Sequence, residues 1–495
     1  MEITFLNIII VLVVLLLFVL AFMLFRTLRY SQPLEPVEMV EAIEVDAEKA
    51  AQHLAGALRF PTVSVLDGNA SGYMSFLDLQ RYLEQTYPLV HSRLSRRRIM
   101  DYALLYTWSG TNSSLDPIVL MAHQDVVPVE EEALSEWVHP PFDGVIADDF
   151  IWGRGALDIK NQMIAILESV EHLLAEGFKP ERTVYLAFGH DEEIGGRGAK
   201  EITNFLNDQG LHLSAVLDEG GSVFEGILPG IKEPVGLVGV AEKGFMTLQL
   251  TVEAAPGHSA IPPRETAIGI LSKALAFLEA APQPTDLSSA QMLFRGLGPV
   301  LPFSLQFALA NLWLFGGIVR KNLEKSPATY AMVHTTTAPT IIKGGVKENV
   351  LPSKATAMVN FRLLPGDTIA SVCERVRKII DDERVKFVPM QGFITEPSTF
   401  SSTESQPYQT LTRTIREMFD GVVVAPMLVL GGTDARNYHP HCDSVYRFSP
   451  MIVNEDDRKR IHGNNERIAV DALATMVQFF AKLIQVWAGP EVTEK

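Results

Sequence analysis

The chain has 495 residues, of which 47% are hydrophobic, and this is enough material for more than one hydrophobic core. Lysine and arginine total 42 against 59 aspartates and glutamates, so the formal net charge is −17. Such a charge disfavours nucleic acid and anionic membrane surfaces as partners. The two cysteines, Cys373 and Cys442, give no disulfide framework and do not fix the cellular compartment.

The N-terminal segment is the most apolar part of the chain. Residues 5–25 are apolar except for Asn7, and as a helix they would span roughly 30 Å, the thickness of a bilayer core. A cleaved signal peptide normally has a basic start and a shorter apolar core, whereas here Arg26 and Arg29 follow the apolar run. Residues 1–30 are therefore predicted to form an uncleaved, single-pass membrane anchor.

The rest of the chain predicts two α/β units. Residues 31–46 have the composition of a polar linker that would hold the body off the bilayer. Strands alternate with helices over 47–240 and again over 391–488, which predicts one catalytic domain in two parts. Between them, 241–390 predicts a smaller inserted lid domain, with strands at 246–252 and 355–364 and helices at 266–280 and 368–381.

Three apolar strand-type runs each end at side chains that can bind metal. Residues 118–122 end at His123, with Asp125 placed to accept the second ring N–H of that histidine. Residues 183–188 lead to Glu192 and Glu193. One of these glutamates could bind metal while the other exchanges a proton, or both could belong to a solvated acidic loop.

Two further acids and a histidine extend the series. Asp158 follows a glycine-rich turn, where it could bridge two metals or cap the predicted helix over 159–173. Asp218 ends the apolar run 214–217, and ligand sites in open α/β sheets lie at such strand ends. Near the C-terminus His462 could complete the set, but sequence spacing does not separate it from its rivals, His439 and His441.

These motifs, in this order, resemble the M20 family of di-zinc metallopeptidases and, within it, the carboxypeptidase S branch, over about residues 47–486. The resemblance implies an aminopeptidase-like α/β catalytic domain with the inserted lid often used for dimerisation, and two zinc ions per subunit. It implies that His123 and Asp218 hold one zinc, that Glu193 and His462 hold the other, and that Asp158 bridges them. It further implies that Glu192 is the general acid/base and that Asp125 orients the first histidine.

Three other segments are predicted to contact substrate. By the resemblance, His258 reaches a catalytic site, commonly that of the partner subunit, and Asn349 adds a polar contact there. Arg362 lies in an apolar strand and needs an anion, either the substrate's free carboxylate or an internal salt-bridge partner. A loop with flexible glycines supplies Gly432, Asp434 and Arg436, of which the last two could also pair with each other.

A second apolar stretch, 300–318, lies inside the predicted insert. Pro302, Gln306 and Asn311 argue against a second membrane span. The stretch predicts either a buried helix or a surface that lines an acyl-chain slot or touches the bilayer.

Together these features predict a membrane-anchored di-zinc amidohydrolase that cleaves the amide between an acyl group, with fatty acyl favoured, and an amino acid with a free carboxylate, a reaction that could also run in reverse. A carboxypeptidase acting on short peptides is the close alternative, and a non-catalytic receptor is the remote one. Nucleic acid is not expected as a partner, whereas a homodimer is. The flanking arginines favour a cytoplasmic body, but the resemblance favours an extracytoplasmic one.

Overall fold

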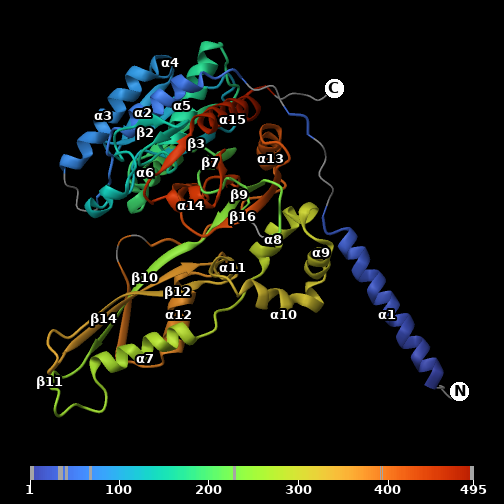
Figure 1. Cartoon of the computed structure of the whole chain (residues 1–495), viewed down its shortest axis with the longest axis vertical. Coiled ribbons are helices and arrows are strands. Elements are labelled where there is room, and N and C mark those ends of the chain that lie inside the picture. The colour runs from blue at the N-terminus through green and yellow to red at the C-terminus, as the bar shows by residue number, and fades with distance from the viewer. Residues whose placement is uncertain are drawn as a thin grey trace.

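The computed structural model describes the chain apart from residues 1–4, 32–36, 40–42, 66–69, 227–229, 391, 393 and 491–495. The larger of its two main sheets carries ten strands and is mixed (Figure 1). Its path is β1 (Ser95–Ile99), β2 (Ala103–Trp108), β6 (Val184–Gly189), β3 (Ile118–His123), β7 (Ala215–Asp218), β17 (Val445–Arg447), β9 (Val235–Glu242), β8 (Val223–Phe224) and β18 (Ile452–Val453), with β16 (Val423–Val429) paired to β9.

The centre of this sheet is parallel, since β6, β3, β7 and β17 pair in the same direction. Every residue of β3, β6 and β7 is buried, which explains why their sequences are continuous apolar runs. The three strands predicted at 118–122, 183–188 and 214–217 are therefore confirmed. Their carboxyl ends lie at one edge of the sheet, so the polar residues that follow them meet there.

Helices cover both faces of the large sheet. On one face α2 (Ala47–Leu58), α5 (Lys160–Ala175) and α15 (Val470–Ala488) share a core with the strands. On the other face α6 (Arg197–Asp208) packs against β2 and β6. Although α15 is long and apolar enough to cross a membrane, half of it is buried in the core, so we assign it to the globular body. The remaining elements of this part are α3 (Ala70–Thr86), α4 (Pro88–Arg93), α13 (Gln406–Met418), α14 (Glu455–Arg460), and a small sheet of β19 (Arg467–Ala469), β5 (Phe150–Trp152) and β4 (Val145–Ala147).

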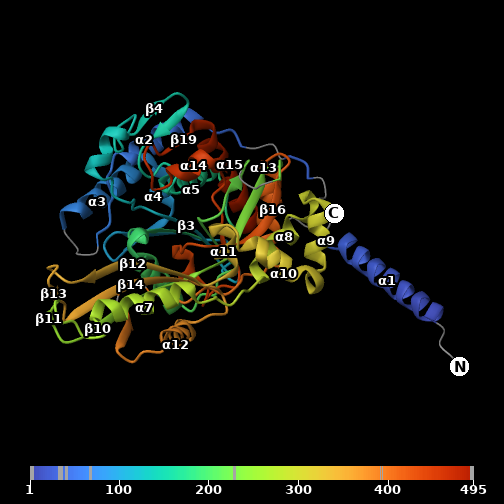
Figure 2. The ribbon, with the colours of Figure 1, turned by 60° about the horizontal axis from the view of Figure 1, so that its bottom comes forward.

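The second main sheet is antiparallel and extends away from the first (Figures 1 and 2). Its order is β12 (Thr336–Gly344), β14 (Lys354–Leu363), β10 (Gly244–Glu253) and β15 (Val385–Pro389). Burial alternates along β10 and β14, and the buried face packs on α7 (Ala267–Ala280) and α12 (Ile369–Ile380). The predicted strands and helices of the insert are thus present, while its exact domain boundaries and its role as a lid stay predictions.

Between α7 and β12 the chain forms α8 (Ser288–Gly296), α9 (Phe303–Ala310), α10 (Leu312–Leu323) and α11 (Pro327–Val333). The sequence of the apolar stretch 300–318 predicts either a buried helix or a surface for an acyl chain or the bilayer. In the structure it forms two helices, α9 and α10, which meet at 115°. Several of its large apolar side chains are exposed, so the buried-helix interpretation is wrong.

The N-terminal helix α1 (Phe5–Leu28) extends away from the body (Figure 1). Its residues 7–28 are long and apolar enough to span a membrane. Only its last turns are buried, at Met23 and Thr27. Residues 32–36 and 40–42 of the predicted linker 31–46 lie outside the described residues, but Ser31 packs directly on Gly298. The body therefore lies beside the end of α1, while the distance that the linker sets between the body and a bilayer stays a prediction.

Candidate metal centre

Acidic and imidazole side chains gather at the carboxyl ends of β3, β6 and β7. His123, the last residue of β3, is buried with 2% of its surface exposed. Its Nε2 lies 3.2 Å from Oδ1 of Asp158 and 3.2 Å from an oxygen of Glu219. On the other side, Nε2 of His462 lies 3.0 Å from Oδ2 of Asp158 and 3.2 Å from an oxygen of Glu193. Asp158 thus offers one oxygen to each histidine, while its role as a bridge between two metals stays a prediction.

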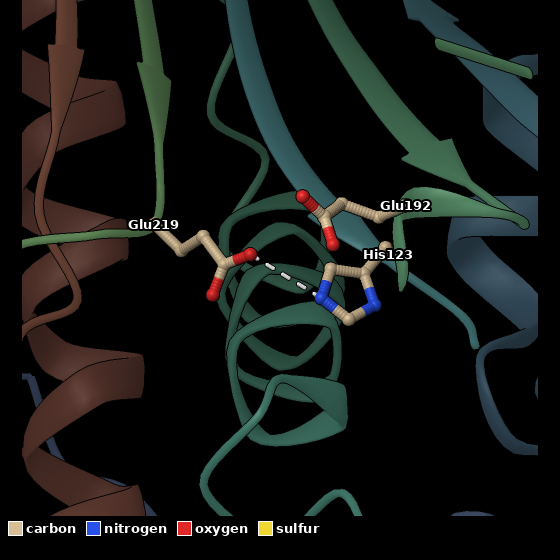
Figure 3. Close-up of side chains that lie close together, drawn as sticks. All are labelled: His123, Glu192 and Glu219. Atoms are coloured by element: carbon tan, nitrogen blue, oxygen red, sulfur yellow. Dashed lines mark ion pairs between the residues drawn. The ribbon is translucent and has the colours of Figure 1, made fainter. Parts of the chain in front are cut away.

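One predicted ligand, Asp218, makes no contact with His123, whereas its neighbour Glu219 does. The structure brings Glu219, and not Asp218, into contact with His123 (Figure 3). The Asp218 carboxylate instead accepts the backbone N–H of Ala435 at 2.8 Å. Neighbouring side chains of an extended segment point in different directions, and here Glu219 faces the centre while Asp218 does not. The sequence signal was the Asp-Glu pair itself, which is of the same kind as Glu192-Glu193.

Glu192 also belongs to this cluster. Its carboxylate, that of Glu219 and the His123 ring offer ligand-type atoms within 4.8 Å of one another (Figure 3). Burial raises the pKa of Glu192 well above its usual range, although the nearby His123 opposes this. A carboxyl group that can hold a proton beside a cluster of ligands is suited to proton transfer.

Asp125 holds two parts of the centre at once. Nδ1 of His123 lies 2.9 Å from the backbone oxygen of Asp125 and 3.3 Å from its carboxylate, so the ring is oriented by this residue as predicted. The same carboxylate accepts the backbone N–H groups of Glu192 at 3.2 Å and Glu193 at 3.1 Å. It therefore fixes the position of the acid pair as well as the histidine.

A residue that the sequence did not reveal, Glu466, fixes the loop that carries Asp158. Its buried carboxylate accepts the backbone N–H groups of Leu157 and Asp158 at 2.7 and 3.0 Å. It also accepts the backbone N–H of Gly155 at 3.0 Å and the guanidinium of Arg154 at 2.7 Å. More than 300 residues separate Glu466 from this loop, so sequence spacing carried no signal.

We expect Glu466→Gln to lower the melting temperature of the full chain by about 5 °C or more, because a buried ion pair loses one partner, at a cost on the order of 3 kcal/mol. The side-chain NH2 of glutamine would also face backbone N–H groups and a guanidinium, which are themselves donors and need an acceptor. Scanning calorimetry of the detergent-solubilised protein measures the shift. Glu253→Gln, at an exposed strand end, is the matched control and should leave the melting temperature unchanged. Equal melting temperatures for the two variants would contradict the role of Glu466.

The charge balance of the cluster fits bound cations. The side chains of Asp158, Glu193 and Glu219 are only 10–16% exposed, yet no lysine or arginine pairs with them among the described residues. Burial and the neighbouring Asp158 raise the pKa of Glu219 to about 8. The acids in turn raise the pKa of His462 to about 10 and that of His123 well above its usual range. Close carboxylates and imidazoles without basic partners are a typical nitrogen and oxygen donor set for divalent metals.

The structure also separates the rival histidines. His439 lies away from the centre, where its Nε2 is 3.2 Å from the guanidinium of Arg447. Burial and that guanidinium lower the pKa of His439 to about 3. His441 makes no contact with the centre among the described residues, whereas His462 faces Asp158 and Glu193.

The predicted glycine loop lies against the acid pair. Arg436 donates to the backbone oxygen of Gly195 at 2.9 Å and lies 3.8 Å from Asp434, so these two side chains do pair. Asp434 is buried, and burial raises its pKa to about 8. A side chain added at Gly432 would come within 3.7 Å of the Arg436 guanidinium. The loop therefore borders the centre, while its contact with substrate stays a prediction.

The other predicted substrate residues lie on the second sheet. Arg362, near the end of β14, stacks over the ring of Phe245 at 4.6 Å. No carboxylate forms a salt bridge with its guanidinium in the described part of the chain, so an internal partner does not explain it. His258 and Asn349 are exposed and lie together, in and beside the pairing of β11 (Gly257–His258) with β13 (Val350–Leu351). That ribbon is at the far end of the second sheet, away from the metal centre of the same chain (Figure 1).

Comparison with known proteins assigns this arrangement to a family. The model of peptidase family M20/M25/M40 matches residues 119–486, which include the whole cluster from His123 to His462. The chain belongs to the M20 peptidase family. It is 43% identical to the N-fatty-acyl-amino acid synthase/hydrolase PM20D1 of Xenopus tropicalis, over 89% of this chain and 86% of that protein. It is also 32% identical to carboxypeptidase S of Saccharomyces cerevisiae, over 88% and 83% of the two chains.

Solved structures show the same fold. A metallo-carboxypeptidase of the M20 family from Sulfolobus solfataricus superposes with a TM-score of 0.64 at 18% identity, over 88% of this chain and 99% of that one. A dinuclear metal-binding M20 peptidase of Bacillus subtilis gives 0.56 at 13% identity, over 89% and 98%. The M20 chain is thus a hydrolytic enzyme acting on amide or peptide bonds, with a mixed α/β fold and a candidate metal site.

Proposed function

We propose that this M20 enzyme uses two zinc ions to hydrolyse the amide bond between an acyl group, with fatty acyl favoured, and an amino acid with a free carboxylate. The observation that carries the proposal is the double pairing of Asp158 with His123 and His462, next to a partly buried Glu192. The choice of a fatty acyl group is supported by the similarity to the N-fatty-acyl-amino acid synthase/hydrolase. An enzyme lowers the barrier of a reaction in both directions. The same site would therefore also catalyse condensation of the acyl group with the amino acid when the reactant concentrations favour it.

The residues of the cluster have distinct proposed roles in metal binding, proton transfer and positioning. His123 and Glu219 would hold one zinc, His462 and Glu193 the other, and Asp158 both. Bound zinc would supply an acidified water near neutral pH and polarise the scissile carbonyl. Glu192 accepts the proton of the attacking water and delivers it to the leaving amine nitrogen, which its raised pKa allows. Asp125 keeps the ring of His123 and the glutamate pair in position.

Residues of the second sheet complete the proposed site. Arg362 would bind the free carboxylate of the substrate, since an arginine without a carboxylate partner offers a bidentate donor. His258 and Asn349 lie too far along the second sheet to serve their own centre, so we propose that they reach the site of a partner subunit in a homodimer. Gly432, Asp434 and Arg436 would border the substrate from the opposite side.

We propose that α1 is an uncleaved membrane anchor and that the body lies on the extracytoplasmic side. The support for anchoring is the length and apolarity of α1, together with the contacts of its last turns with the body. A cleaved helix would leave those contacts exposed.

Comparative kinetics on the zinc-loaded full chain test the substrate class. We expect kcat/KM for N-oleoyl-phenylalanine to exceed that for glycyl-phenylalanine at least tenfold, because a buried acyl chain needs to contribute only about 1.4 kcal/mol more to the transition state. A preference for the dipeptide would make the enzyme a carboxypeptidase, the alternative favoured by the similarity to carboxypeptidase S. Metal binding with no turnover of either amide would indicate a receptor.

A further inference from the structure

The bent pair of α9 and α10 presents an apolar surface beside the membrane helix. Its exposed large side chains are between 37% and 62% accessible, namely Phe303 and Leu305 on α9 and Trp313, Leu314 and Ile318 on α10. The basic residues Arg320 and Lys321 follow on the last turns of α10. An apolar surface with a tryptophan and flanking basic residues is typical of a helix in the membrane interface.

The bend is attached to α1. Asn311, between α9 and α10, is fully buried, and its side-chain amide donates to the backbone oxygen of Met23 at 3.3 Å and to Oγ1 of Thr27 at 3.4 Å. Figures 1 and 2 both show α9 beside the C-terminal end of α1, with α10 next to it. If α1 spans a bilayer, α9 and α10 are held at the level where α1 leaves it. The asparagine that argued against a membrane span thus serves a contact between helices.

A cavity of about 1300 Å³ opens at the same level. It lies between the end of α1, α8, the α9–α10 bend, α13 and β16, and its lining includes the arginines Arg26, Arg29 and Arg295. Among the described lining residues there is no aspartate or glutamate. In a chain of net charge −17 this gathering of arginines is a local reversal of the overall charge. Guanidinium groups bind phosphate oxygens in bidentate geometry, so the cavity is complementary to a phosphate-bearing group.

We propose that α9 and α10 are embedded in the same leaflet as the C-terminal end of α1, and that the arginine-lined cavity binds the headgroup of an anionic phospholipid from that leaflet. The apolar surface and the arginines are adjacent, as the acyl chains and the headgroup of one lipid are. The overall charge disfavours anionic membrane surfaces as partners, and the proposal replaces that expectation at this one surface. It rests on the proposed membrane anchor.

Tryptophan fluorescence in lipid nanodiscs tests the embedded helices. The chain has five tryptophans, and Trp108, Trp137, Trp152 and Trp487 are all at most 8% exposed in the body, whereas Trp313 is 57% exposed. We expect phosphatidylcholine brominated on its acyl chains to quench roughly one fifth of the emission, one tryptophan of five, and Trp313→Phe to abolish this quenching. Absence of quenching, or equal quenching of the variant, would overturn the embedded position.

The same preparation separates the two levels of the proposal. A full chain that fails to elute with the nanodiscs would refute the anchor. A chain that elutes with them but shows no quenching of Trp313 would refute only the position of α9 and α10.

Lipid retention tests the cavity. The full chain is extracted from nanodiscs of equal phosphatidylcholine and phosphatidylglycerol, and the lipids that remain bound after gel filtration are measured by mass spectrometry. We expect phosphatidylglycerol to be enriched about threefold, and Arg295→Gln to reduce the enrichment to near one. Arg264→Gln is the matched control, since it removes an exposed arginine that lies outside α9 and α10 and does not line the cavity. Equal retention of both lipids by the native chain, or an unchanged enrichment in Arg295→Gln, would overturn the assignment.

Discussion

Replacement of Glu192 by glutamine is expected to lower kcat about 10³-fold while the bound metal stays in place, because the substitution keeps the shape of the side chain but removes proton transfer. The structural basis is the position of this partly buried carboxyl group within 4.8 Å of His123 and Glu219, with its pKa raised by desolvation. Kinetics with the N-acyl amino acid and metal analysis by mass spectrometry on the same sample measure both effects.

Glu201→Gln provides the control for this experiment. It makes the same chemical change on the exposed side of α6, and should leave kcat within about twofold of the native value. Near-native turnover by Glu192→Gln would remove this residue from the chemistry. Loss of metal in that variant would instead make Glu192 a ligand.

A comparison of Glu219→Gln with Asp218→Asn should give the second large effect. Glu219 faces His123 at 3.2 Å, so its neutral analogue is expected to reduce bound zinc from about two ions per chain to about one, and activity by at least about 100-fold. Asp218 accepts the backbone N–H of Ala435, which the amide oxygen of asparagine can still do. We therefore expect Asp218→Asn to keep both ions.

Metal content by plasma mass spectrometry, after dialysis against zinc-free buffer, distinguishes the two acids. The opposite pattern, with zinc lost from Asp218→Asn and kept by Glu219→Gln, would restore the assignment made from the sequence. Because the two residues are neighbours, each variant also serves as the positional control for the other.

The sequence was sufficient for the parts of the site that follow buried strands. Runs such as 118–122 are wholly apolar because both faces of the central strands are covered, so the polar residues that follow each run lie at the edge of the sheet. This is why His123, Glu192 and Glu193 were found without a structure. The choice between Asp218 and Glu219 was not accessible, since it depends on the direction of two side chains at one strand end.

The role of Glu466 could not be predicted from the sequence for a different reason. Glu466 reaches the loop of Asp158 only because β19 pairs with β5, and no local pattern encodes that pairing. In the same way, composition showed that 300–318 is apolar, but whether its side chains face a core or the outside depends on the bend at Asn311.

The hydrogen bonds of Asn311 to the last turns of α1 fix the orientation of the body relative to this helix. With α1 in a bilayer, the catalytic cluster would stand at a constant height above the lipid surface. A substrate amide dissolved in the bilayer would then have to move over that distance to reach the catalytic cluster. Each methylene group exposed to water during this transfer would cost about 0.8 kcal/mol. An amphiphilic substrate could reach the cluster only along an apolar surface. The distance between the bilayer and the cluster would therefore select among acyl chains of different length.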